Sequence, residues 1–340
     1  MADELTTYGS MSQRTASYAA ARILKTGQDH LVAERFAQAE VLPKKKSKSI
    51  TFRRYEDLPD ADAPLAEGIP PAAVQPTFSD ITVSVEQYGG LIRLTDVIVD
   101  HHEDPVLNKF MDLCGKQAAR ARELVTISVL KSGTNVFYAN NAASRSAVNS
   151  PPLRSDLRRI YRYFRRHKAE TISRIVRASA KISTEAVLPA YFVLGSTDLD
   201  ADIRNMDGFL DAKNYSDSTK ALPYEIGSVD QFRFILTPLF EPWLAAGASG
   251  TTYLSNGDIV SSAAKCDVYP LIVVAADSYA VVRFQGKNAV KPVVVNPHKP
   301  SHSNPLGQEG HVGWISKHAA VILNHNWLAR LECAATAIPS

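Results

Sequence analysis

Two short stretches near the beginning of the chain alternate between apolar and polar residues. Residues 50–55 alternate around Ile50 and Phe52, and residues 81–86 show the same pattern. A period of two predicts a β-strand in each stretch. The segment between them holds five prolines, which remove amide donors and prevent it from extending a sheet. A loop of this length is uncommon inside a compact domain, so we predict an arm whose partner is another subunit.

The next stretch has the helical period. Apolar residues recur at steps of three and four from Leu107 to Val125, which predicts one amphipathic helix. Pro105 suits the first helical position, and Gly133 suits the C-terminal stop. We therefore predict a spine helix over about 105–131, roughly 40 Å long at a rise of about 1.5 Å per residue.

A second helix is predicted from about Leu153 to Lys168, with Leu157 and Phe164 on its apolar face. The rest of this helix is basic and carries Arg154, Arg158, Arg159, Arg162, Arg165 and Arg166. Such a face fits either a nucleic-acid contact or a solvated, ion-paired surface. We favour ion pairing, because the proline-rich segment is acidic and needs a partner. Its acidic residues are Glu56, Asp57, Asp60, Asp62 and Glu67.

The two ends of the chain differ in character. Residues 1–48 predict an arm, since two short helical stretches, over about 13–25 and from Asp29, are not apolar enough to form a core of their own. From about 177 to 304, mixed strands and loops predict a separate α/β domain, and alternation over 327–333 predicts a C-terminal strand. The arm ends in a basic run that either contacts phosphate or an acidic neighbour, or forms a solvated linker. This run contains Lys44, Lys45, Lys46 and Lys48.

Composition narrows the class of protein. The chain has 340 residues, of which 45% are hydrophobic and 21% charged, as in ordinary globular proteins. Its net charge of +3 is small for a free-standing DNA binder. The three cysteines show no CxxC spacing, which argues against a disulfide framework or a zinc ribbon. The acidic N-terminus is unlike a signal peptide, and the apolar runs are too short to span a bilayer. We expect a soluble protein made in a reducing cytoplasm, with no membrane partner.

Motifs for catalysis are missing from the sequence. It contains no phosphate-binding GxxxxGK(S/T) or GxGxxG loop and no GxSxG elbow. His101 and His102, together with His298 and His302, offer metal ligands. Adjacent histidines cannot face one point on a helix, however, and no HExxH spacing is present. We expect no catalytic residue, cofactor or metal, and keep a metal-dependent hydrolase as an alternative.

Short motifs occur in one order along the whole chain. They are FRRY at 52–55, PLAEG at 64–68, QYG at 87–89, GTNV at 133–136, PLGQ at 305–308, GW at 313–314, AVILN at 320–324 and NWLAR at 326–330. In this order they resemble the major capsid proteins of tailed double-stranded DNA phages, which have the fold named after phage Hong Kong 97. The sequence is most similar to the branch typified by the N-four coliphage coat protein.

The resemblance implies an α+β fold of the Hong Kong 97 type. It implies an N-terminal arm over 1–48, an extended E-loop over 49–86, a peripheral domain with the spine helix over 87–176, an axial domain over 177–307, and a return to the peripheral domain over 308–340. The implied function is structural: hexamers and pentamers that close into an icosahedral head around double-stranded DNA.

The resemblance also implies partners and a location. The partners are copies of the chain itself, a portal, a possible decoration protein and packaged DNA. Because the arm is short, we expect a separate scaffolding protein. The location is the virion, after assembly in the host bacterial cytoplasm.

Two candidate surfaces follow from the charges. We predict that the acidic residues of the E-loop lie over the arginine-rich helix of a neighbouring subunit, where the contacts are Arg154, Arg158, Arg162 and Arg165. We predict that the lysines of the arm face packaged DNA without sequence preference. The alternatives are a cellular nanocompartment shell of the same fold, a DNA-binding module based on the basic helix, and the hydrolase.

Overall fold

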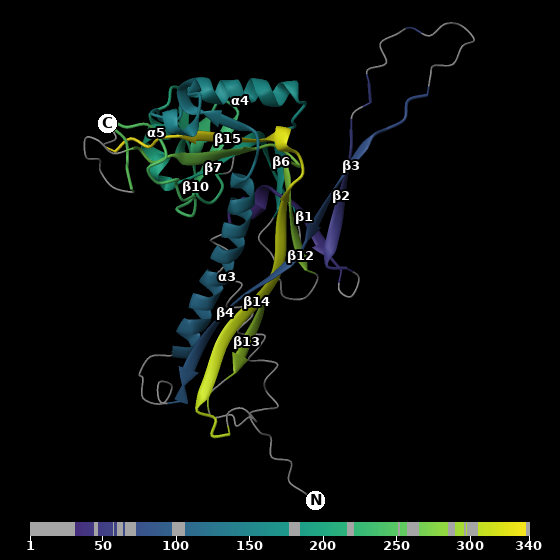
Figure 1. The fold of residues 1–340 in the computed structure, drawn as a ribbon, viewed down its shortest axis with the longest axis vertical. Coiled ribbons are helices and arrows are strands. Elements are labelled where there is room, and N and C mark those ends of the chain that lie inside the picture. Colours follow the sequence, from purple (N-terminus) through teal and green to yellow (C-terminus); the bar gives the residue numbers. More distant parts are fainter. Residues whose placement is uncertain are drawn as a thin grey trace, which may run out of the picture.

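The structure is a computed structural model with three visible parts. Figure 1 shows a wide body at one end, a long helix with an elongated sheet that extends away from it, and a hairpin that projects to the side. The residues that it describes are 31–43, 47–56, 58–59, 64, 73–96, 106–176, 184–215, 221–250, 252–256, 265–284, 290–295, 297 and 305–337.

The elongated sheet is built around one long strand, β14 (Glu309–Ile322). Strand β4 (Glu86–Thr95) pairs antiparallel with one edge of β14. Strands β12 (Tyr279–Phe284) and β13 (Val290–Val295) pair in turn with the other edge. Beyond β12, the short strand β1 (Gln38–Leu42) adds a parallel pair. The sheet therefore forms only when segments from the beginning and the end of the chain meet.

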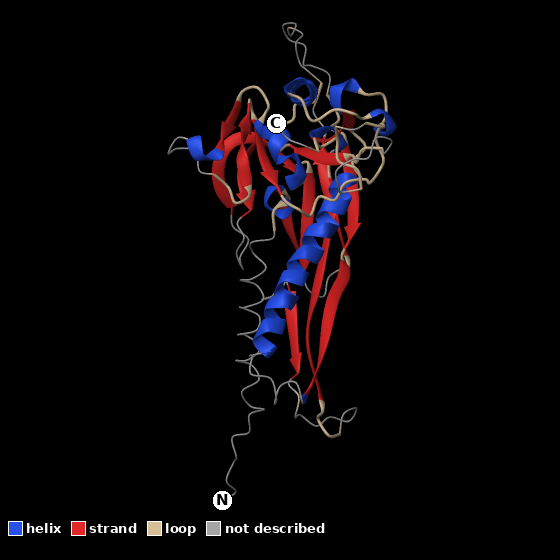
Figure 2. Ribbon diagram, turned by 90° about the vertical axis from the view of Figure 1, so that its left-hand side faces the viewer, coloured by secondary structure: helices blue, strands red, loops and turns tan. Residues whose placement is uncertain are grey.

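Helix α3 (Val106–Lys131) lies along one face of this sheet, as Figure 2 shows. Its apolar stripe, which includes Met111, Cys114 and Ala118, forms one core with residues of β14 such as Trp314. The predicted spine helix is thus present, with nearly the predicted bounds.

The wide body contains an eight-stranded sheet. Its strands follow the order β5-β15-β11-β7-β10-β9-β8, and β6 pairs with β7. Helix α4 (Arg154–Arg166) covers one face through Leu157, Ile160 and Phe164. The strands are β5 Val136–Tyr138, β6 Ile172–Val176, β7 Thr184–Gly195, β8 Phe209–Asp211, β9 Glu225–Val229, β10 Phe232–Leu236, β11 Tyr269–Val274 and β15 Leu328–Cys333.

Side chains of the central strands alternate between two cores. In β7, Tyr191 and Val193 enter the core beneath α4, whereas Phe192 and Leu194 enter a second core that contains Phe36. Strand β11 divides its residues in the same way. A strand buried on both faces carries a continuous apolar run instead of an alternating pattern. This explains why residues 191–194 and 271–274 are apolar without interruption.

The remaining elements are short. Strands β2 (Ser49–Tyr55) and β3 (Phe78–Ser84) pair antiparallel and form the projecting hairpin at the two stretches predicted from alternation. The short helices are η3 Ala33–Phe36, η4 Ala139–Asn141, η5 Arg145–Ala147, η6 Thr197–Leu199, α5 Asp200–Arg204, η7 Ala212–Asn214 and η8 His325–Trp327.

The start of the described chain differs from the sequence expectation. The helix expected from Asp29 is a single 3₁₀ turn, η3, which is followed by β1. Val32, Ala33 and Phe36 are buried in the body, so this part of the predicted arm belongs to the core. The helix predicted over 13–25 lies outside the described residues.

Sheet pairing does not follow the predicted domain boundaries. Strands β12 and β13, from the stretch 177–307, pair with β14 in the elongated sheet. Strand β15, from the stretch 308–340, pairs with β11 in the body. Helix α4, from the stretch 87–176, also packs on the body sheet. Burial of apolar faces decides which sheet each of these elements joins. Closeness in the sequence does not decide it.

Gly313→Ala tests the crowding at the centre of the elongated sheet. A Cβ atom at Gly313 would lie 2.7 Å from the carbonyl oxygen of Gly90 and 3.0 Å from Leu91 Cδ1. Because β4 is held in a ladder of hydrogen bonds, it cannot move aside cheaply. We expect the substitution to lower the free energy of unfolding by about 1–3 kcal/mol, measured by urea denaturation of the unassembled subunit.

Gly250→Ala is the matched control for this substitution. Its Cβ would meet only Tyr253 Cδ2, at 3.9 Å, which is an ordinary contact. An equal loss of stability in the two variants would contradict the steric explanation.

Candidate intersubunit surfaces

The exposed face of the projecting hairpin carries a connected set of aromatic and charged side chains. Arg53 donates two hydrogen bonds of 2.8 Å to the carboxylate of Asp80, and its guanidinium lies 4.3 Å from the ring centroid of Phe78. Tyr55 contacts Phe78 edge-on, with 6.3 Å between ring centroids. Hydrogen bonding to Arg53 lowers the pKa of the Asp80 carboxyl. Tyr55 and Phe78 nevertheless remain 67% and 54% exposed.

The base of the hairpin is anchored to the elongated sheet. On its other face, Ile50, Phe52 and Val83 pack against a small core that includes Leu42 and Val282. A two-stranded hairpin is only marginally stable by itself. The base therefore holds the two strands in place, while their far end presents exposed aromatic side chains to solvent.

Only one of the five predicted acidic contacts lies within the described residues. The backbone N–H of Glu56 donates to the Thr77 carbonyl at 3.0 Å, and its carboxylate accepts from the Thr77 hydroxyl at 3.1 Å. The acidic segment thus begins directly beyond the aromatic end of the hairpin. The other four residues, Asp57, Asp60, Asp62 and Glu67, lie outside the described residues.

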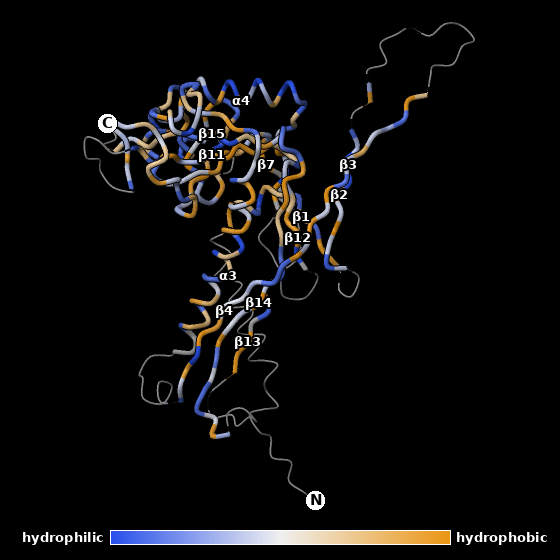
Figure 3. Tube along the Cα trace, in the orientation of Figure 1, coloured by the Kyte–Doolittle hydropathy of each residue, from blue (hydrophilic) through white to orange (hydrophobic). Residues whose placement is uncertain are grey.

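Helix α4 uses part of its arginines for contacts within the chain. The carboxylate of Asp230 pairs with Arg154 at 2.5 Å and with Arg158 at 3.4 Å. Hydrogen bonding to Arg154 lowers the pKa of Asp230. Arg162 is exposed and forms no ion pair with any residue in the described part of the chain. Figure 3 shows hydrophilic residues along most of α4.

The partner of Arg154 and Arg158 was missed by the sequence analysis. Asp230 lies in the turn between β9 and β10 with φ of 52°, and sheet pairing brings that turn to the beginning of α4. No local sequence signal connects positions so far apart. Among the other predicted contacts, Arg165 donates to the Tyr161 hydroxyl at 3.2 Å.

Lys48, the last residue of the lysine run, directly precedes β2 at the base of the hairpin, where its carbonyl accepts a hydrogen bond from the Val85 N–H at 3.0 Å. Lys48 forms an ion pair with Glu86 at 2.9 Å, with both side chains more than half exposed. Exposed pairs of this kind contribute little to stability. Lys44, Lys45 and Lys46 lie outside the described residues.

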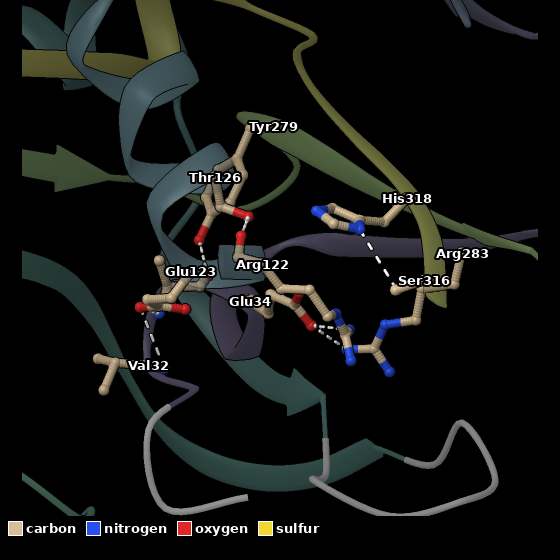
Figure 4. Close-up of polar contacts among 10 residues, drawn as sticks. Val32, Glu34, Arg122, Glu123, Thr126, Tyr279, Arg283, Ser316 and His318 are labelled. Carbon is tan, nitrogen blue, oxygen red and sulfur yellow. Dashed lines mark hydrogen bonds and ion pairs between the residues drawn. The ribbon is translucent and has the colours of Figure 1, made fainter. Parts of the chain in front are cut away.

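A cluster of buried polar groups attaches the start of the described chain to α3 (Figure 4). Glu34 accepts hydrogen bonds from Arg122 and from Arg283, each at 2.5 Å. Burial opposes ionisation of Glu34, but these two guanidiniums lower its pKa overall. The Oε1 atom of Glu123 accepts from the backbone N–H groups of residues 32 and 33, at 3.2 and 2.6 Å. Side chains of α3 and β12 thus take the place of water as hydrogen-bond partners of residues 32–34.

Two further strands complete the cluster. Tyr279 of β12 donates to the Ala33 carbonyl. His318 of β14 lies 3.4 Å from Ser316 Oγ and 4.5 Å from the ring of Tyr88. Burial lowers the pKa of His318 to about 4, so this imidazole is neutral near pH 7. Nothing in the sequence separated these residues from ordinary surface charges, because their burial depends on four distant segments meeting.

The metal-binding alternative finds no support in the described residues. They contain no group of three or more His, Cys, Asp or Glu placed to hold a metal ion. The cysteines Cys114, Cys266 and Cys333 are free and buried. Within the same residues, each helix is too short or too polar to cross a bilayer. The histidines weighed for that alternative, His101, His102, His298 and His302, lie outside the described residues.

Comparison with known families gives a match over most of the chain. A family model described as phage capsid protein matches residues 79–322. The chain belongs to this phage capsid family. The matched range runs from β3 to the end of β14 and includes α3 and most of the body sheet, so membership rests on the fold's core and not on one motif.

Individual relatives of this capsid family are distant in sequence. The major capsid protein of Pseudomonas phage KPP21 is 21% identical over 268 residues, which cover 74% of this chain and 66% of that protein. The match therefore spans slightly less than two thirds of the relative's length.

Solved structures share the fold at low identity. The capsid of Ralstonia phage GP4 has a TM-score of 0.64 at 9% identity, and the match covers 89% of this chain and 88% of that chain. The head structure of Helicobacter pylori bacteriophage KHP40 has a TM-score of 0.58 at 10% identity, with the same coverage. The SrpI encapsulin complex from Synechococcus elongatus has a TM-score of 0.51 at 9% identity, covering 87% of this chain and 84% of that one.

These matches confirm the predicted phage capsid family and the α+β capsid fold. The family and the fold point to a structural protein and not to an enzyme. The similarity to the N-four coliphage branch stays a prediction.

Proposed function

We propose that this capsid-family chain is a major capsid subunit that assembles into hexamers and pentamers of an icosahedral phage head around double-stranded DNA. The observation that carries the proposal is the hairpin of β2 and β3. It extends Tyr55 and Phe78 away from the body with most of their surface uncovered. Tyr and Arg are enriched at the residues that dominate binding energy in interfaces, and both occur on this face.

The geometry suits head-to-tail association. The hairpin projects to one side of the body (Figure 1), which places its exposed face where it can reach a different patch on the next copy. Such heterologous contacts close into rings when the rotation between copies is right. Each contact need only be weak, since several contacts made at once raise the effective concentration of the others.

Replacing the two exposed aromatic residues tests this function. The double variant Tyr55→Ser and Phe78→Ser removes the apolar surface that the neighbouring subunit would bury. We expect the yield of closed particles, counted by negative-stain microscopy, to fall at least about tenfold, because hot-spot losses exceed about 1.4 kcal/mol per contact. The unfolding of the unassembled subunit should change little, since both side chains are already exposed.

The matched control exchanges the aromatic residues instead of removing them. Tyr55→Phe combined with Phe78→Tyr keeps the rings and should assemble normally. Normal particle yield from the serine variant would overturn the proposed role of the hairpin.

We also propose that the acidic segment, residues 56–67, lies over α4 of a neighbouring subunit. The segment begins at the end of the hairpin, and α4 presents Arg162 without an ion pair to a described residue. Because Asp230 already engages Arg154 and Arg158, Arg162 is the strongest candidate contact. Arg165 remains a further candidate beside it.

Charge reversal tests this pairing. The variant Asp60→Lys with Asp62→Lys should lower particle yield, because like charges then face each other. Adding Arg158→Glu and Arg162→Glu should restore part of it, and most of the recovery should come from Arg162→Glu, since glutamate at 158 would face Asp230. Normal assembly of the lysine variant would show that the acidic segment has another partner or none.

The lysine run is proposed to contact packaged DNA through phosphate alone. Replacing Lys44, Lys45, Lys46 and Lys48 with glutamine should make filled particles less stable at low salt, and their stability should then depend less on salt concentration. Each lost phosphate contact should reduce the slope of log affinity against log salt by about 0.9. Filled particles with unchanged salt dependence would contradict the contact.

A second candidate function is a cellular nanocompartment shell, which the likeness to an encapsulin makes reasonable for this fold. Such a shell would enclose protein cargo and not DNA. Nuclease-protected DNA inside purified particles would show that they are phage heads and not nanocompartment shells. A phage head would also involve a scaffolding protein, a portal and a decoration protein, and its location would be the virion after assembly in the bacterial cytoplasm.

A further inference from the structure

The two carboxylate oxygens of Glu123 have unlike surroundings. Its Oε1 atom accepts both hydrogen bonds from the backbone of residues 32 and 33. Its Oε2 atom is buried and has no hydrogen-bond partner among the described residues. The residue as a whole is fully buried in the middle of α3. A proton on Oε2 would remove the charge and leave Oε1 free to keep both bonds.

Glu34 is a second buried carboxyl group in the same cluster, and it is stably ionised. It has two guanidiniums, from Arg122 and Arg283, and keeps a low pKa. Among the described residues, Glu123 has no such ion pair, and the Arg122 guanidinium turns to Glu34 instead (Figure 4). Burial raises the pKa of Glu123 to about 7, the nearby charge of Glu34 adds to this, and the two amide hydrogen bonds and Arg122 oppose it. Two buried carboxyls in one cluster thus prefer opposite protonation states.

We propose that Glu123 is a proton-controlled latch: its neutral carboxyl fixes residues 31–37 to α3, and ionisation of that carboxyl loosens the attachment. The attached segment is otherwise held by packing. Phe36 stacks on Phe192 with 4.3 Å between ring centroids, and Val32 and Ala33 are buried. Residues 31–37 open the described chain, so the latch makes the attachment of this segment to the body depend on pH.

The direction of the effect follows from proton linkage. When the segment detaches, Glu123 meets water and its pKa returns from about 7 to 4.5. Detachment then releases a proton between about pH 4.5 and 7, so it becomes easier as pH rises through this window and levels off above it. The attachment is tightest in acid. Within the window, its equilibrium constant should change by up to about tenfold per pH unit.

The other titrating groups of the cluster cannot produce this trend. Glu34 and His318 both have lowered pKa values, so their exposure takes up protons and favours detachment in acid, which is the opposite sign. The pKa of Tyr279 is raised far above this range. The guanidinium group of an arginine stays charged across this range.

Hydrogen exchange of the full-length chain tests the latch. The protection factor of a peptide covering residues 32–37 is measured from pH 5.0 to 7.5, relative to the unstructured rate at each pH. A peptide from β11 in the same sample serves as an internal reference for global stability. We expect the protection of residues 32–37 to fall by more than tenfold across this range relative to the reference. The measurement reports on residues 32–37 alone and does not require a shell. Its result is therefore independent of whether the proposed function is correct.

Two variants separate the latch from general destabilisation. Glu123→Gln has the shape of the protonated residue, and its protection should no longer fall as pH rises, staying at or above the acid level of the wild type. Glu40→Gln, on β1 and partly exposed, should keep the wild-type slope. A flat wild-type profile would overturn the proposal, and so would a wild-type slope in Glu123→Gln. If Glu123→Gln does not fold, the pH profiles of the wild type and of Glu40→Gln still test the latch.

Discussion

The fold depends on α3 belonging to two hydrophobic cores at once. Near its beginning, Met111 and Cys114 pack against the elongated sheet, and near its end Ile127 and Leu130 pack with residues of the body. A single continuous helix therefore fixes the orientation of the two parts. The last turn is held from the body side, where the Lys131 carbonyl accepts a hydrogen bond from Arg330. Such contacts satisfy carbonyl groups that a helix end leaves without partners.

Buried charge recurs at the places where distant segments join. Glu332, fully buried in β15, pairs with Arg145 and Arg330, and the Arg145 guanidinium lies 3.9 Å from the ring centroid of Trp243. Glu34 has the same arrangement at the start of the described chain. Buried ion pairs add little net stability, but removing one partner is costly. An alternative pairing of the segments that left one of these charges buried without its partner would therefore be costly.

The exposed hairpin contrasts with these buried joints. Its base is anchored and its aromatic end is bare, which suits a subunit whose remaining partners are copies of itself. The latch at Glu123 and the hairpin lie on the two sides of β1, so anchorage of the N-terminal segment and presentation of the hairpin are separated by one short strand.

The sequence by itself determined the local elements. Alternation located β2 and β3, three-to-four spacing located α3 and α4, and short ordered motifs identified the capsid family. These succeed because they depend on neighbours within one turn or one strand. Only the tertiary structure decided which sheet each strand joins, that Asp230 engages Arg154 and Arg158, and that Glu34 and Glu123 are buried. Burial and ion pairing depend on which distant segments exclude water together, and no local pattern contains that information.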